Sequence, residues 1–99
     1  MNLPGRRVLN PREFENPGDF CWAIHNTDDD TIVAIYLKCP SCGSTHGVPV
    51  KPGNPHGWDW DGNLDKPTLS PSILFGDGHI DNRECRWHGF LRNGEWIDA

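Results

Sequence analysis

The sequence predicts a small all-β domain, and three observations support this prediction. The 99 residues include eleven glycines and nine prolines, which interrupt the chain too often for long helices. Apolar residues alternate with their neighbours in several short segments, which is the period of a strand. Two cysteine-containing turns stand between such segments. A chain of this length buries roughly two thirds of its unfolded surface, so the core is thin, and five tryptophans enlarge it.

The N-terminal segment differs from the rest of the chain. Residues 1–18 contain three prolines and no sustained apolar period, and we expect an irregular arm there. The apolar alternation begins at Asp19. The predicted organisation is therefore an arm over residues 1–18 and a single zinc-binding β domain over residues 19–99.

A hairpin and a short strand are predicted in the first half of this domain. In residues 20–25 the large apolar side chains of Phe, Trp and Ile alternate with Cys, Ala and His. Residues 26–30 supply turn-forming Asn, Thr and Asp, and TIVAIYLK follows at 31–38. Both faces of TIVAIYLK are apolar, as expected for a strand in the middle of a sheet. STHGVPV, at 44–50, predicts a short strand, and KPGNPHG, at 51–57, predicts a loop.

The second half predicts shorter extended pieces. WDWDGN, at 58–63, runs into a turn, and PTLSPSILF, at 67–75, carries two prolines that confine it to an edge or an irregular path. GFLR and EWID flank Asn93-Gly94, a pair that tolerates the positive φ angles of a type I′ turn. This is the strongest hairpin signal in the chain.

CPSCG at 39–43 and CRWHG at 85–89 share the order ligand, two residues, ligand, glycine. Four sulfur or nitrogen ligands suit a closed tetrahedral zinc site. We therefore predict one structural Zn²⁺ held by Cys39, Cys42, Cys85 and His88. Two such turns between strands are the plan of a zinc ribbon, with a tryptophan-rich insertion between the two knuckles.

Other interpretations of these residues remain open. A redox dithiol requires Cys39 at a helix start, which the following glycines and prolines disfavour. A disulfide is disfavoured in a reducing compartment. His46 follows Cys42 by four residues and is an alternative ligand to His88. Cys21 lies between Phe20 and Trp22 and is interpreted as a buried free thiol.

The tryptophan segment, PTLSPSI and the Cys-x-x-His knuckle carry a resemblance to a known family. Over roughly residues 36–97 the chain resembles a family of small proteins of unknown function from bacteria, prophages and phages. The matching motifs are Trp58 with Trp60, Pro67–Ile73, Cys85 with His88, and Asn93-Gly94. The resemblance implies a metal-binding domain, in some cases near mobile elements or ubiquitin-like conjugation genes.

PTLSPSI admits two interpretations. In the first, hydroxyl groups satisfy the backbone of a proline-broken edge while the tryptophans fill the core. In the second, aromatic and polar side chains form a groove for a peptide or small ligand. The candidate partner-binding residues in the second interpretation are Trp58, Trp60, Thr68, Ser70 and Ser72.

Charge and composition narrow the function classes. The net charge of −5 disfavours nucleic-acid binding, and only Arg83, Arg86 and Arg92 form a local basic spot. MNLPGRRVLN lacks the apolar stretch of a secretory signal, so a cytoplasmic location is expected, in the host cytoplasm if a phage encodes the chain. No membrane association is expected.

We expect a zinc-stabilised binding or regulatory module of phage or mobile-element origin that contacts a protein partner, rather than an enzyme. Two alternatives remain. The first is a metal-dependent hydrolase that uses histidine and aspartate residues around the insertion: His56, Asp59, Asp61, His79 and Asp81. The second is a nucleic-acid-binding zinc ribbon.

Overall fold

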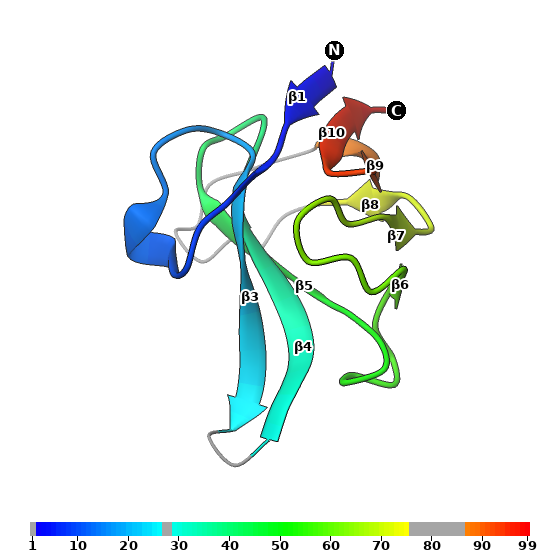
Figure 1. Ribbon diagram of the computed structural model, residues 1–99. Helices are drawn as coiled ribbons and strands as arrows, with labels where there is room; N and C mark the ends of the chain where they lie inside the picture. Colours follow the sequence, from blue (N-terminus) through cyan, green and yellow to red (C-terminus); the bar gives the residue numbers. More distant parts are fainter. Residues whose placement is uncertain (1, 27–28, 76–86) are drawn as a thin grey trace.

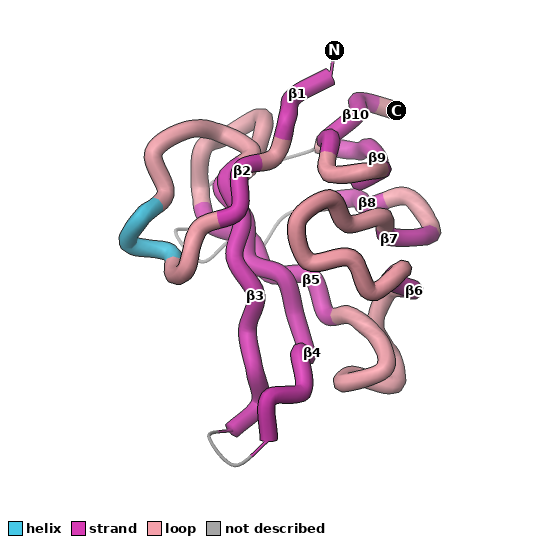
Figure 2. The backbone as a smooth tube through the Cα atoms, in the orientation of Figure 1, coloured by secondary structure: helices cyan, strands magenta, loops and turns pink. Residues whose placement is uncertain are grey.

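Ten strands and one 3₁₀ turn make up the described part of the chain, which is residues 2–26, 29–75 and 87–99 of a computed structural model. The prediction of an all-β fold is confirmed (Figure 2). The elements are β1 (Asn2–Pro4), β2 (Arg6–Arg7), the 3₁₀ turn η1 (Pro11–Glu13), β3 (Asp19–Asn26), β4 (Asp29–Lys38), β5 (Thr45–Pro49), β6 (Asp59–Trp60), β7 (Leu69–Ser70), β8 (Ile73–Leu74), β9 (His88–Arg92) and β10 (Glu95–Asp98).

One sheet has the strand order β2-β3-β4-β5. The predicted hairpin of residues 20–25 and 31–38 is confirmed, because β3 pairs antiparallel with β4. Strand β4 also pairs with β5, so it lies inside the sheet as its apolar composition predicts. Ile35 and Leu37 of β4 are fully buried.

A second sheet has the order β1-β10-β9-β8. Asn93 and Gly94 adopt φ angles of 50° and 78°, so the tight β9–β10 turn has the positive φ values predicted for it. Trp96 of β10 is 1% exposed, and its indole Nε1 donates to the carbonyl of Gly18 at 2.9 Å. This bond ties the second sheet to the chain that enters β3.

The N-terminal residues differ from the expected irregular arm. Strand β1 pairs with β10, and β2 pairs in parallel with β3, so residues 2–7 connect the two sheets. Leu3 packs against the core, and the amide of Gly5 donates to the carbonyl of Gly94 at 2.8 Å. The N-terminal strand lies next to the C-terminal one at one end of the molecule (Figure 1).

The core is made of side chains from both sheets. Its buried members are Phe20, Ile35, Leu37, Cys39, Val48, Val50, Leu69, Ile73, Phe75, Trp87, Leu91 and Trp96. Trp22, Trp58 and Trp60 are partly buried and pack against this core. Strands β6 and β7 form a separate two-stranded pair, which places residues 68–72 beside β9. This arrangement brings PTLSPSI next to the second sheet.

Candidate active site

A serine next to β8 and a histidine in the adjacent strand β9 lie in hydrogen-bond contact. The Oγ atom of Ser72 is 3.0 Å from Nε2 of His88. Ser72 comes just before β8, and His88 is the first residue of β9. We call these two residues the Ser–His pair.

The strand register explains why these two side chains meet. Leu74 is opposite His88, and Ile73 is opposite Gly89. Side chains alternate between the faces of a strand, so Ser72 and Leu74 share the face of His88. The opposite face is apolar and buried, with Ile73 at 1% exposure, whereas Leu74 and His88 are exposed. The core therefore fixes the backbone while the Ser–His pair faces solvent.

Trp58 holds the backbone at the serine. Its indole Nε1 donates to the carbonyl of Ser72 at 3.2 Å. The backbone of Trp58 is itself fixed, because its amide donates to the carbonyl of Pro49 at 2.8 Å and its carbonyl accepts from the amide of Lys51 at 2.9 Å. The tryptophan thus links the segment after β5 to the serine.

A groove lies beside the Ser–His pair. It has a volume of about 400 Å³, and its lining includes Thr68, Pro71, Ser72, Phe90 and Arg92. The guanidinium carbon of Arg92 is 4.2 Å from the centre of the Phe90 ring, which is a cation–π contact. A positive charge and an aromatic face therefore stand in the same groove as the serine hydroxyl.

This geometry suits nucleophilic catalysis. A neutral imidazole within about 2.6–3.2 Å of a serine hydroxyl can remove its proton as the oxygen attacks a carbonyl carbon. The imidazolium then donates that proton to the leaving group. Within the described residues, no carboxylate lies within hydrogen-bond distance of the His88 ring. The observed arrangement is therefore a pair of residues rather than a triad.

A second set of reactive side chains lies between β4 and β5. The ligand atoms of Cys39, Cys42 and His46 all lie within 4.8 Å of one another. Cys39 and His46 are buried, at 0% and 8% exposure. We call this set the Cys–His cluster. Of the four predicted zinc ligands, the structure brings together Cys39 and Cys42, while His88 contacts Ser72 and Cys85 lies outside the described residues.

The predicted partner-binding residues have distinct positions. Trp58 supports Ser72, and Trp60 packs on Trp22 with ring centres 4.6 Å apart. The Thr68 hydroxyl oxygen accepts from the amide of Asn93 at 2.8 Å, and Ser70 is exposed in β7. One hydroxyl in PTLSPSI thus accepts a hydrogen bond from a backbone amide, and another contacts His88, a contact that neither interpretation predicted.

The histidine and aspartate residues of the hydrolase alternative do not gather in the described structure. Asp59 pairs with Lys51 at 3.3 Å, while Asp61 accepts from the backbone amides of Asn63 and Thr68. His56 is exposed in a turn. His79 and Asp81 lie outside the described residues, as do Arg83 and Arg86 of the basic spot.

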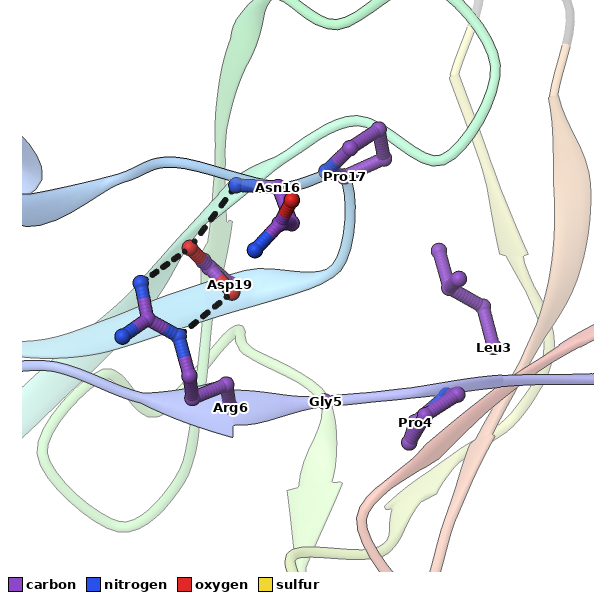
Figure 3. A pocket seen from close by; sticks show the side chains of 7 residues that line it. All are labelled: Leu3, Pro4, Gly5, Arg6, Asn16, Pro17 and Asp19. Atoms are coloured by element: carbon purple, nitrogen blue, oxygen red, sulfur yellow. Dashed lines mark hydrogen bonds and ion pairs between the residues drawn. The ribbon is translucent and has the colours of Figure 1, made fainter.

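A second hollow, of about 450 Å³, lies between the N-terminal strands and the start of β3 (Figure 3). Asp19 there is 2% exposed and accepts from the guanidinium of Arg6 at 2.8 and 3.2 Å. Burial alone would raise the pKa of Asp19, but the bonds from Arg6 and from the amides of Asn16 and Glu15 lower it to about 2. This hollow contains a structural ion pair and, among its lining residues, no histidine, cysteine or serine.

Sequence reasoning missed the Ser–His pair because no local motif joins its members. Ser72 was assigned to a partner surface and His88 to a metal. The available signal was the alternation in PTLSPSILF and in HGFLR, which puts each residue on the exposed face of its own strand. Only the pairing of these strands brings the two together, and that pairing spans a long sequence separation.

Comparison with protein families identifies a family for most of the chain. Residues 8–99 match the family described as BubE, bacterial ubiquitination-like system serine protease. No curated protein and no solved structure matches the chain. Among the described residues, no helix has the length and apolar character to span a membrane.

The match corrects the expected function. A zinc-stabilised binding or regulatory module was predicted, with a metal-dependent hydrolase and a nucleic-acid-binding ribbon as alternatives, and this prediction is wrong because the matched family is one of serine proteases. The expectation of a non-enzyme conflicts with the family description as well. The resemblance to small bacterial proteins agrees with the match in its bacterial part. Since the match covers nearly the whole sequence, the chain belongs to the BubE family of bacterial ubiquitination-like system serine proteases.

Proposed function

We propose that this chain is a serine peptidase that acts on a protein substrate in a bacterial ubiquitination-like system. Ser72 is the nucleophile and His88 is the general base. The observation that carries the proposal is the 3.0 Å contact between Ser72 Oγ and His88 Nε2. Membership of a serine protease family is the independent support.

The reaction follows from this contact. The Ser72 oxygen attacks the carbonyl carbon of a peptide bond, and His88 takes the hydroxyl proton. His88 then protonates the leaving amine, and an acyl group remains on Ser72. A water molecule, deprotonated by His88, releases that acyl group and restores the hydroxyl.

The surroundings of the pair suit an extended protein segment. Ser72 and His88 are on the solvent face of β8 and β9, so a substrate can approach without any opening of the core. The groove beside them offers Phe90 for apolar contact and Arg92 for a negatively charged group of the substrate. The Trp58 bond to the Ser72 carbonyl keeps the nucleophile in register.

Labelling with a fluorophosphonate tests the proposal without knowledge of the substrate. Such a reagent phosphonylates a serine that a neighbouring base activates. We expect one adduct per chain, located at Ser72 by peptide mass spectrometry. Ser72→Ala and His88→Ala should abolish it.

Ser70→Ala is the matched control. Ser70 lies two residues before Ser72 in the same Ser-Pro-Ser sequence, is exposed, and has no histidine contact among the described residues. This variant should still be labelled at Ser72. An adduct at Ser70, or unchanged labelling of His88→Ala, would show that the Ser–His pair is not the reactive centre.

A further inference from the structure

The Cys–His cluster has the composition of a soft metal site. Two cysteine sulfurs and one imidazole nitrogen are ligands that zinc accepts, whereas magnesium and calcium prefer oxygen. The cluster is formed locally, because Cys39 and Cys42 lie in the turn between β4 and β5 while His46 is the second residue of β5. No long-range rearrangement is needed to assemble it.

The distances agree with one shared ion. In a tetrahedral zinc site the bonds are about 2.3 Å to sulfur and about 2.0–2.1 Å to nitrogen. A sulfur ligand and a nitrogen ligand of the same ion are therefore about 3.6 Å apart. The Sγ atom of Cys42 is 3.7 Å from Nε2 of His46. The full set lies within 4.8 Å. The side chains are thus already spaced as the corners of one coordination sphere.

The backbone of the turn is arranged for a thiolate. The amides of Ser41 and Cys42 both point at Sγ of Cys39, at 3.3 and 3.5 Å. Hydrogen bonds of this kind favour the charged form of a side chain, and the thiolate is the form that binds metal. Gly43 closes the turn at a φ of 76°, where a side chain is disfavoured, and its amide donates to the Cys39 carbonyl at 3.1 Å.

His46 of the cluster packs against Phe75, which lies near the Ser–His pair along the chain. Its ring stacks on Phe75, with centres 3.8 Å apart and planes 8° from parallel. The amide of Phe75 donates to the carbonyl of Trp87 at 2.8 Å, and the two rings are 5.7 Å apart. Phe75 follows the strand that begins after Ser72, and Trp87 directly precedes His88.

We propose that Cys39, Cys42 and His46 bind one zinc ion, and that this ion fixes His46 beneath Phe75 and Trp87 and so holds the Ser–His pair in register. The metal has a structural role, since Cys39 and His46 are buried and none of the three ligands lines the groove. Metal binding is independent of the proposed peptidase function. The effect on register rests on that function.

Metal analysis of the full chain tests the binding. The chain is purified under reducing conditions and loaded with zinc, and its metal content is measured by elemental mass spectrometry. We expect about one zinc per chain. Cobalt loading should give the sulfur-to-cobalt charge-transfer absorption of a thiolate site. A chain that binds no stoichiometric zinc or cobalt would overturn the proposal and leave the peptidase proposal untouched.

Four variants identify the ligands. His46→Ala and Cys42→Ser should each weaken zinc binding by more than about tenfold, because even loss of a residue behind a ligand commonly reduces affinity that much. Cys21→Ser and His88→Ala should keep full metal content, since Cys21 is a buried thiol outside the cluster. Metal loss in His88→Ala with retention in His46→Ala would overturn this ligand set.

Chelation of zinc from the wild-type chain tests whether the ion holds the Ser–His pair in register. This test does not depend on whether the variants fold. Removal of zinc should slow fluorophosphonate labelling of Ser72 at least tenfold, and readdition of zinc should restore the rate. An unchanged labelling rate in the metal-free chain would show that the ion does not support the Ser–His pair. Absence of labelling in the zinc-loaded chain would instead reject the peptidase proposal.

Discussion

His46 and His88 occupy opposite environments. His46 is 8% exposed, lies near two cysteines, and stacks flat on Phe75. His88 is exposed and contacts the hydroxyl of Ser72. The first environment suits a residue that is held in place, and the second suits a residue that exchanges protons with a substrate. In our proposals, histidine therefore contributes to stability at position 46 and to catalysis at position 88.

Sequence spacing alone does not identify the neighbours of either histidine. CRWHG has the same spacing as CPSCG, and this similarity predicts that His88 is a metal ligand. In the folded chain, His46 is the histidine beside Cys42, because β5 returns antiparallel to β4 and places it opposite Leu37. The registers of β4 with β5 and of β8 with β9 determine which residues lie next to the two histidines.

Replacement of each histidine by alanine should give the largest effects, and the two variants should differ from each other. His88→Ala should lower the rate of peptide-bond hydrolysis by roughly 10²–10⁴-fold, the usual contribution of a general base. Its melting temperature should change little, because the ring is exposed. His46→Ala should lower the melting temperature strongly and, because it weakens zinc binding, should also slow hydrolysis. Parallel measurement of hydrolysis and thermal melting checks both, and a His88→Ala chain that melts far below the parent would contradict the assignment.

The ion pair between Asp19 and Arg6 should affect stability and leave the chemistry of Ser72 unchanged. Asp19→Asn removes the ion pair with Arg6, and we expect a loss of about 2 kcal/mol in unfolding free energy at pH 7, because the pKa of Asp19 in the folded chain is lowered from 3.8 to about 2. The folded-state pKa lies below the unfolded one. The stabilisation is therefore present above about pH 4 and disappears as the pH falls toward about 2.

Urea unfolding at several pH values measures this contribution. The difference between the parent and Asp19→Asn should shrink across the acid range, while Ser72 labelling at neutral pH stays the same in both. A constant difference down to pH 2 would show that the pair does not stabilise the chain through the charge of Asp19.

Trp58→Phe should have the smallest effect. The variant keeps the aromatic packing and removes the bond from Nε1 to the Ser72 carbonyl. One such bond contributes about 0.5–1.5 kcal/mol, so the labelling rate of Ser72 should fall by about tenfold or less. Trp60→Phe is the control, because its indole donates to Asn63 instead. Equal rates in the parent and Trp58→Phe would remove Trp58 from the positioning of the nucleophile.

Much of the fold could be predicted from local patterns. The alternation before and within TIVAIYLK predicted β3 and β4, and Asn93-Gly94 predicted the β9–β10 turn, because each signal lies within a few residues of the structure it specifies. The strands of residues 2–7 gave no such signal. They are two and three residues long and are fixed by distant partners, including Gly94 and Asp19.

The candidate site could be predicted only in part. Its residues were visible as chemically capable groups, since Ser72, His88, Cys39 and Cys42 all received a role. Which of them meet depends on the antiparallel register of β8 with β9 and of β4 with β5. A shift of one residue between β4 and β5 would turn His46 to the other face of its sheet, and the same shift between β8 and β9 would turn His88.

A crystal structure of the zinc-loaded, fluorophosphonate-treated chain tests most directly whether the two histidines have separate roles. Anomalous scattering at the zinc edge locates the ion, and electron density locates the adduct. We expect one zinc peak within bonding distance of Cys39, Cys42 and His46, and a phosphonate on Ser72 with His88 beside it. A zinc peak on His88, or an adduct on any residue other than Ser72, would contradict it.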